Sequence, residues 1–256
     1  MQNDDSGRGR VLSRREVLAL LGATGFAVAA RPLAAAERWA GAKPTDSAQP
    51  HGCVVRPEQT EGPYFVDERL QRSDIRADSS DGRVRPGAAL ALAFNVSRLA
   101  GSDCTPLAGA LVDVWHCDAL GIYSGVEDPS FDARGSNAFR GYQITDAAGS
   151  ARFTTIYPGW YSGRTVHIHF MIRSAPDVRP GFNFTSQLYF DDDLTDRVHA
   201  LEPYTSKGMR NARNARDGIY RRGGKDLMLA VASDKDLHRA AFEIALEMDP
   251  DGTPRT

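Results

Sequence analysis

One stretch, residues 156–170, constrains more than any other what this chain can fold into. It holds two tyrosines, an arginine and a His-x-His pair. From Thr165 to Ile172 the residues alternate in hydrophobicity with a period of two, which is typical of a β-strand. The apolar positions are Val166, Ile168, Phe170 and Ile172. We expect a half-buried strand that directs these side chains into a core and both imidazoles to the opposite face.

His167 and His169 on one strand face are spaced for a shared metal ion. At a rise of roughly 3.3 Å per residue, their Cα atoms lie about 6.6 Å apart. Both rings can then reach one ion at bond lengths of about 2.0–2.2 Å. The alternative is that two histidines share a solvated strand face and bind nothing.

The neighbouring residues favour ferric iron over other metals. A catalytic zinc site recruits a third His, a Cys or a carboxylate, and Fe(II) oxygenases use two His and one carboxylate. The residues around His167 are instead rich in tyrosine, whose phenol has a pKa near 10 and binds a metal acidic enough to displace its proton. Candidates for the remaining ligands are Tyr123, Tyr157, Tyr161, His116, Cys117, Asp113 and Asp118.

The rest of the chain indicates many short strands and little helix. Strands are expected at 90–96, 110–116, 142–145, 151–157, 184–190, 227–231 and 237–248, with a hairpin at 146–149, one short helix within 192–201 and a basic loop at 203–224. The spacing of apolar residues in 237–248 also fits a helix, and a strand is the favoured interpretation. This pattern predicts an all-β fold, an antiparallel β-sandwich with long loops. His51, His199 and His238 are interpreted as surface histidines.

The composition does not suggest nucleic acid or a membrane as a partner. The chain has 256 residues, 41% of them hydrophobic and 25% charged, with a net charge of −2. Such a balance gives no reason to expect nucleic acid or an anionic membrane as partner. No apolar run reaches the roughly 18 residues of a membrane-spanning helix.

The N-terminal residues carry an export signature. Arg14 and Arg15 precede an apolar run from Val17 to Ala30, and Ala34–Ala36 resemble a cleavage site. We therefore expect a twin-arginine-type signal peptide at 1–36, a flexible lead at 37–52 and a catalytic domain at 53–256, exported to the periplasm or the medium. A chance Arg-Arg in an ordinary secretory signal is the alternative.

Export has a consequence for the three cysteines, because disulfides persist in an oxidising compartment. Cys53 and Cys104 both lie in loop-like sequence, whereas Cys117 is expected inside a strand. We expect a disulfide between the first two and a free thiol at Cys117.

Two segments carry a family resemblance. Residues 111–123 and 156–170 resemble the two iron-binding segments of the intradiol ring-cleavage dioxygenases, and residues 59–64, 141–149 and 187–190 are similar to further segments in the same order. The combination is specific: a Trp followed eight residues later by a Tyr, then Pro-Gly-x-Tyr, then His-x-His.

The resemblance implies a non-haem Fe(III) site. By motif position its ligands are Tyr123, Tyr161, His167 and His169. Tyr157 competes with Tyr161 for the second position, and the Pro-Gly-x-Tyr match favours Tyr161.

The resemblance also implies the surrounding residues and the reaction. Arg164 and Gln187 would steady negative charge on the substrate, Tyr161 would accept a proton, and Gly62, Pro63, Tyr64 and Tyr189 would contact the substrate. The expected activity is cleavage by O2 of a catechol-type ring between its hydroxyls, giving a muconate-type diacid. Whether the substrate is catechol, protocatechuate or hydroxyquinol stays open, as does monomer or homo-oligomer.

Two other functions stay open at the level of sequence. One is a non-catalytic exported β-sandwich that binds aromatic or carbohydrate ligands. The other is a zinc or copper enzyme that adds a third ligand such as His116 to His167 and His169.

Overall fold

A computed structural model describes residues 53–179, 181–235 and 237–249 of the chain. The expected signal peptide at 1–36 and lead at 37–52 lie outside these residues. Contacts divide the chain into units 1–48 and 49–256, and the described residues belong to the second unit. None of their helices is long and apolar enough to cross a membrane.

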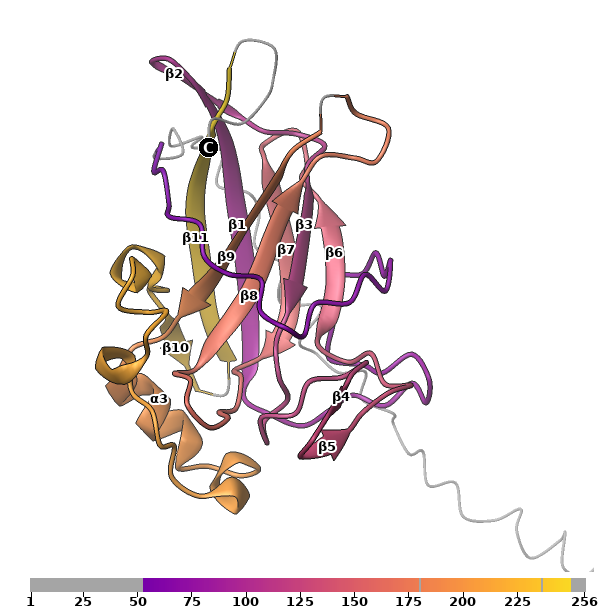
Figure 1. Ribbon diagram of the computed structural model, residues 1–256, viewed down its shortest axis with the longest axis vertical. Coiled ribbons are helices and arrows are strands. Elements are labelled where there is room, and N and C mark those ends of the chain that lie inside the picture. Colours follow the sequence, from indigo (N-terminus) through magenta and orange to yellow (C-terminus); the bar gives the residue numbers. More distant parts are fainter. Residues whose placement is uncertain (1–52, 180, 236, 250–256) are drawn as a thin grey trace, which may run out of the picture. The chain divides into compact units, whose positions relative to one another are not determined.

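Two sheets form the body of the described unit (Figure 1). The first has the order β10-β11-β1-β2, with β7 also paired to β1, and the second has the order β6-β3-β8-β9. The first contains β1 (Ala89–Ala100), β2 (Asp103–Pro106), β7 (Ser150–Ile156), β10 (Ala232–Asp234) and β11 (Leu237–Glu247). The second contains β3 (Leu111–Trp115), β6 (Arg140–Ile144), β8 (His167–Arg173) and β9 (Asn183–Tyr189). A small hairpin of β4 (Glu127–Asp128) and β5 (Phe131–Asp132) lies apart from both.

The core lies between the two sheets. Phe94 of β1 and Phe170 of β8 have ring centroids 5.3 Å apart, and Phe170 also packs 5.6 Å from Phe242 of β11. All three side chains are almost fully buried. Burying an aromatic side chain contributes on the order of 2–3 kcal/mol, so such pairs hold the sheets together. The fold is therefore the expected all-β sandwich.

One sheet is mixed, although the prediction was an antiparallel sandwich. β1 pairs with β11 in parallel, with Ala89 opposite Leu237 and Leu99 opposite Glu247. The other strand pairings in the described residues are antiparallel. The parallel pair is possible because β11 is distant in sequence, so the chain has room to return to the same end of the sheet.

The predicted hairpin at 146–149 is wrong. Its local turn is present, since Asp146 N–H donates to Ser150 O and Gly149 N–H to Asp146 O. However, β6 pairs with β3 and β7 pairs with β1, so the turn carries the chain from one sheet to the other. Gly149 allows this because its φ is +73° and a Cβ would lie 2.2 Å from Val96 O.

The predicted strand at 227–231 is also wrong. A 3₁₀-helix, η3 (Gly224–Leu227), precedes an extended segment that makes a single bridge between Met228 and Tyr189, and the strand β10 begins only at Ala232. Leu227 and Leu229 are buried, so their alternation reflects packing onto the core without a ladder of hydrogen bonds.

The predicted short helix is confirmed as α3 (Asp192–His199). Asp191 is its N-cap and accepts hydrogen bonds from the backbone of Asp193 and Leu194, so the Asp-Asp-Asp run begins a helix. Two 3₁₀-helices, η1 (Tyr204–Lys207) and η2 (Asn214–Arg216), follow within the segment expected to be a loop.

Two histidines differ from their interpretation as surface residues. His238 is only 9% exposed and bonds to Ser233, while the His199 ring stacks on Tyr204. His51 lies outside the described residues.

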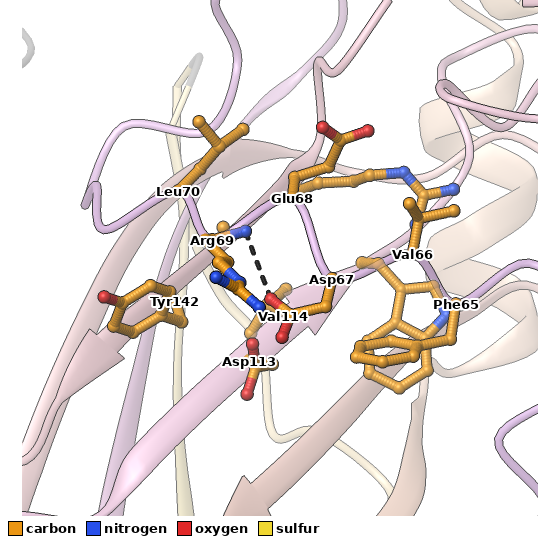
Figure 2. Close-up of a pocket in the computed structure, with 12 residues that line it drawn as sticks. Phe65, Val66, Asp67, Glu68, Arg69, Leu70, Asp113, Val114 and Tyr142 are labelled. Atoms are coloured by element: carbon orange, nitrogen blue, oxygen red, sulfur yellow. Dashed lines mark hydrogen bonds between the residues drawn. The ribbon is translucent and has the colours of Figure 1, made fainter. Parts of the chain in front are cut away.

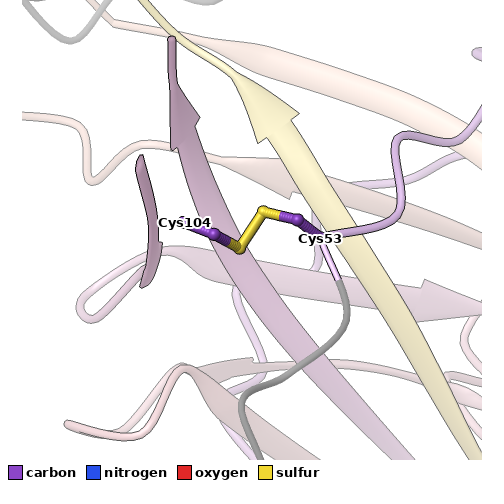
Figure 3. Close-up of a disulfide and its surroundings, with 2 residues drawn as sticks. All are labelled: Cys53 and Cys104. Atoms are coloured by element: carbon purple, nitrogen blue, oxygen red, sulfur yellow. A yellow bond between two sulfur atoms is a disulfide. The ribbon is translucent and has the colours of Figure 1, made fainter. Parts of the chain in front are cut away.

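A disulfide joins Cys53 and Cys104, the pair expected from the sequence (Figure 3). Cys104 belongs to β2, so the bond fixes the start of the described chain beside the first sheet. Cys117 is buried and free, as expected, but it follows the end of β3 at Trp115 and does not lie inside the strand. From Cys53 the chain runs toward the outer face of β8 and β9, where the candidate site lies.

Candidate active site

His167 and His169 lie side by side on β8. Their Nε2 atoms are 3.1 Å apart, and the rings are 2% and 1% exposed. The expected half-buried strand is thus buried on both faces, because other segments cover the histidine side. The apolar residues of β8 point into the core as predicted.

A backbone contact fixes the proton on His167. Its Nδ1 lies 2.6 Å from Thr165 O, and a carbonyl oxygen only accepts hydrogen bonds. Nδ1 therefore carries the hydrogen, which leaves the lone pair on Nε2 directed at His169. Burial, reinforced by the Arg164 charge, lowers the pKa of His167 to about 3, so the ring is neutral and able to bind a metal.

The structure separates the two competing tyrosines. Tyr161 Oη lies 3.2 Å from His167 Nε2. Tyr157 is directed elsewhere: its hydroxyl bonds to Thr195 Oγ1 at 2.7 Å and its ring packs 4.3 Å from Phe190. Tyr161 therefore belongs to the histidine cluster and Tyr157 to the core.

Tyr123 completes the cluster from a loop that follows β3. Its ring centroid is 5.8 Å from that of Tyr161 and 6.2 Å from that of His169. Its hydroxyl is buried and has no hydrogen-bond partner within the described part of the chain. Burial raises the pKa of both Tyr123 and Tyr161 well above 10, so a phenolate here needs a cation beside it.

Arg164 reaches the histidine cluster despite its place before the strand. Nη1 lies 3.5 Å from His167 Nε2, while Nη2 donates to Gln187 Oε1 at 2.6 Å and Nε to Asp217 Oδ2 at 2.7 Å. The strand begins only at His167, so the alternation that would turn Arg164 away does not apply.

Strand pairing brings Gln187 and Tyr189 to the same place. In the β8–β9 register Gln187 lies opposite His169 and Tyr189 opposite His167. Gln187 Nε2 donates to Thr60 O at 2.8 Å, and the Tyr189 hydroxyl donates to Gln59 Oε1 at 2.6 Å. These bonds attach the 59–64 segment to the site.

The 62–64 segment covers the histidines. Gly62 has a φ of +74°, and a Cβ there would lie 3.2 Å from the His169 ring. The Tyr64 ring stacks 4.6 Å from Tyr123 and meets Tyr161 edge-on at 6.3 Å, while its hydroxyl donates to Asp128 at 2.7 Å. Pro63 is exposed between them.

His116 lies near the cluster but is not available to a metal. Its Nδ1 is 2.7 Å from Cys117 O and its Nε2 is 2.6 Å from Thr155 Oγ1, so both nitrogens have partners. Within residues 53–249, apart from 180 and 236, no group of three or more His, Cys, Asp or Glu side chains is placed to hold a metal ion. A metal at His167 and His169 would need tyrosine ligands.

Comparisons with known proteins identify the family of this chain. A family model described as Dioxygenase matches residues 60–202, more than half of the chain. This chain belongs to the intradiol ring-cleavage dioxygenase family.

A curated relative matches about half of this chain. "Catechol 1,2-dioxygenase 2" of Acinetobacter lwoffii is 34% identical over 157 residues, which is 54% of this chain and 52% of that protein. The chain thus spans about half the length of this curated relative.

Among solved structures, "Intradiol ring-cleavage Dioxygenase from Tetranychus urticae" is 29% identical, with a TM-score of 0.64 over 75% of this chain and 94% of that one. A dioxygenase domain from Streptomyces sp. SirexAA-E is 31% identical, with a TM-score of 0.52 over 76% and 99% of the two chains.

The donor atoms of this intradiol family member fit a single metal ion. The contacts from Tyr161 Oη to His167 Nε2 and from there to His169 Nε2 are 3.2 and 3.1 Å. Ligands bound at about 2.0–2.2 Å to one ion lie roughly 2.9–3.5 Å from each other. The Tyr123 hydroxyl, which has no hydrogen-bond partner among the described residues, is available as a fourth donor.

Sequence reasoning missed Asp217 and Asn214. Both are buried, and both bond to residues at the entrance of β8: Asp217 to Arg164 and Thr165, and Asn214 to Thr165. One signal was present, because Asp217 is the single acidic residue in the basic 203–224 stretch.

A small cavity lies beside the site (Figure 2). It is too small for an aromatic ring. Its volume is about 10 Å³, enough for about one water molecule. It is lined by residues 65–70, 113–115 and 140–142, which include Trp115, whose indole stacks 5.0 Å from the His169 ring. A larger hollow of about 330 Å³ lies at the Gln59–Thr60 side, with Arg222 and Ile219 opposite.

Proposed function

We propose that this chain is a non-haem ferric dioxygenase that cleaves a catechol-type ring between its two hydroxyl groups with O2, giving a muconate-type diacid. The observation that carries the proposal is the cluster of Tyr161, His167 and His169 donor atoms beside the buried, unbonded hydroxyl of Tyr123. Family membership supports the reaction class.

Four residues would hold the iron: Tyr123, Tyr161, His167 and His169. Two phenolates and two neutral imidazoles are hard and intermediate donors that suit ferric iron. When bound, the ion supplies a strongly acidic centre that favours the deprotonated form of a catechol and activates it toward O2. Two phenolates also leave the ferric centre with a reduced net charge, which suits a buried site.

Tyr161 is placed to accept a proton from the substrate. It is partly exposed, whereas Tyr123 is 1% exposed and packed against Trp115 and Met171. The more accessible phenol is the one that a substrate hydroxyl can reach. Its Oη would take one catechol proton, and the second leaves with solvent.

Arg164 and Gln187 would stabilise the charge that develops on the substrate. Two edges of the Arg164 guanidinium are bonded to Asp217 and Gln187, while Nη1 faces the histidines. A preorganised cation at this place costs no reorganisation during reaction, and such donors typically contribute on the order of 100-fold or more in rate.

The 62–64 segment, which includes Tyr64, would cover the aromatic ring of the substrate. Tyr64 lies within van der Waals reach of Tyr123 and edge-on to Tyr161, so an aromatic substrate meets aromatic walls. The Gly62 backbone allows this segment to approach His169 closely. Tyr189 contacts the site through Gln187 and Gln59 and so supports the wall.

We also propose export by the twin-arginine route. The Arg14–Arg15 signature and the Cys53–Cys104 disulfide both support an oxidising compartment. A fusion of residues 1–52 to a reporter that is active only after folded export tests this. Loss of export on replacing both arginines with lysine supports the twin-arginine route, and unchanged export contradicts it.

The experiment that tests the main proposal combines metal analysis, spectroscopy and turnover. Purified protein should contain about one iron per chain and absorb visible light through tyrosinate-to-iron charge transfer, and the band should shift when catechol is added under nitrogen. Catechol, protocatechuate and hydroxyquinol should then be compared for oxygen uptake and diacid product. Iron-loaded protein that binds catechols without oxygen uptake would indicate the binding-module alternative, and zinc or copper in place of iron would contradict the ferric site.

A further inference from the structure

The segment after the family-matched region is fastened to the entrance of β8. The match ends at residue 202, and the 203–224 segment follows. Asn211 Oδ1 accepts from the backbone of Gly163 at 3.2 Å, and Asn214 Oδ1 accepts from Thr165 Oγ1 at 2.6 Å. Asp217 makes the third attachment. The 203–224 segment, expected from its sequence to be a basic loop, therefore forms hydrogen bonds with the residues that precede His167.

Asp217 is a fully buried carboxylate with four donors. Oδ2 accepts from Arg164 Nε at 2.7 Å and from Thr165 N–H at 2.8 Å. Oδ1 accepts from the backbone N–H groups of Ile219 and Tyr220 at 2.7 and 2.9 Å. The exposed fraction of Asp217 is 0%. A buried carboxylate is stable only where its oxygens keep their hydrogen bonds, so these four donors hold the Asp217 side chain in a single orientation.

The two bonds of Oδ2 orient two different groups of the site. The guanidinium of Arg164 is planar, and acceptors on its Nε and Nη2 edges fix that plane, which leaves Nη1 facing His167. The Thr165 peptide is held through its N–H, and its carbonyl accepts from His167 Nδ1. One carboxylate thus sets the direction of a charge and the orientation of an imidazole.

We propose that Asp217, outside the family-matched residues, is a positioning residue for ring cleavage that acts through Arg164 and the Thr165 peptide. The inference rests on the proposed function. It predicts that the charge of Asp217 matters for turnover more than for retention of iron, because none of the four proposed ligands bonds to it directly.

A double-mutant cycle tests the link to Arg164. We expect Asp217→Asn to lower kcat/KM by roughly 10- to 100-fold, mainly through kcat, since misplacing a catalytic group by about 1 Å has effects of this size. Arg164→Ala should lower it further. If Asp217 acts through Arg164, the loss in the double variant should be clearly smaller than the product of the two single losses, and any loss beyond that of Arg164→Ala measures the part that acts through the Thr165 peptide. If the two effects multiply fully, the proposal is wrong.

Asp113 offers a matched control. It is also buried and makes a bidentate pair, with Arg173 Nε and Nη2 at 2.7 and 3.0 Å, but at the opposite end of β8. Asp113→Asn should lower thermal stability while leaving kcat, KM and the charge-transfer band near those of the unmodified protein. An equal loss of kcat in both Asn variants would show a general effect of breaking buried ion pairs and would overturn the proposal.

A measurement without iron or substrate separates this inference from the proposed function. In iron-free protein the Arg164 Nε–H should exchange with solvent at least 10-fold faster in Asp217→Asn than in Asp113→Asn, as followed by nitrogen-15 NMR. Unchanged protection contradicts the positioning role, whatever the protein catalyses. Absence of ring cleavage in the unmodified protein would instead contradict the proposed function while leaving the exchange result interpretable.

A second variant covers failure of Asp217→Asn to fold. Asp217→Glu keeps the charge and moves it outward by one methylene. We expect this variant to bind iron and to show reduced kcat, and its double variant with Arg164→Ala should again lose less activity than the product of the two single losses. Full kcat in Asp217→Glu would overturn the proposal.

Discussion

Tyr157 and Tyr161 are four residues apart, yet only the Tyr161 hydroxyl faces His167, at 3.2 Å. Tyr157 points into the core, where its hydroxyl bonds to Thr195 of α3. Between them, Gly159 lies so close to the carbonyl of Ala119 that a Cβ would be 2.4 Å away, which fixes the turn of this loop against the one that leads to Tyr123. Loop packing therefore selects which phenol enters the site.

The first prediction compares Phe variants of these two tyrosines. Tyr161→Phe should lose or shift the charge-transfer band and lower kcat on the order of 100-fold, because a ligand and a proton acceptor are removed. Tyr157→Phe should keep iron and colour and lose about 1 kcal/mol of unfolding free energy, since one buried hydrogen bond disappears. Visible spectra, iron content and denaturant unfolding check both. The reverse pattern would transfer the ligand role to Tyr157.

The second prediction concerns the close approach of Gly62 to His169. Gly62→Ala places a Cβ 3.2 Å from the imidazole in a backbone with φ of +74°, so it should displace the cover and raise KM several-fold. Gly101→Ala is the control, because its φ is +63° but no atom lies within 4 Å of the added Cβ. Both variants should lose roughly 1–2 kcal/mol of stability from backbone strain. Steady-state kinetics should show a raised KM in Gly62→Ala alone. Equal KM values in the two variants would contradict the proposal that the 62–64 segment covers the substrate.

Periodicity predicted those parts of the fold whose order is local. The alternation in 165–172 located β8 and placed both histidines on one face. The short helix expected within 192–201 corresponds to α3. These features depend on neighbours within a few residues, which a sequence displays directly.

Pairing over long distances was not predictable in the same way. The 146–149 turn has the hydrogen bonds of a hairpin, and only the separate partners of β6 and β7 show that it joins two sheets. The parallel pairing of β1 with β11 joins residues separated by more than half the chain. Asp217 lies in irregular structure, where no period marks which side chain turns inward.

The third prediction concerns the disulfide. Opening the Cys53–Cys104 bond, which closes a loop of 51 residues, should cost about 4 kcal/mol of unfolding free energy by the chain-entropy argument. The site should survive, because Gln59 and Pro57 are anchored independently by Tyr189 and Ser186. Reduced protein, or Cys104→Ser, should unfold at lower denaturant yet keep its iron colour. Loss of colour at unchanged stability would mean that the bond orders the site directly.

The last prediction uses His116, which is buried beside the site but has partners of its own. Burial lowers the pKa of His116 to about 4, below the usual 6.5 or so of an unfolded chain. Between these values the unfolded state binds more protons, so the contribution of His116 is present above about pH 6.5 and is lost as the pH falls toward 4. At 1.36 kcal/mol per unit, the loss is about 3 kcal/mol. Denaturant unfolding of iron-free protein should show that the fall in unfolding free energy between pH 7 and 4 is smaller by about 3 kcal/mol in His116→Gln, whose amide can keep one hydrogen bond and does not titrate. Parallel pH profiles of the two proteins would mean that His116 is solvated or protonated in the folded state.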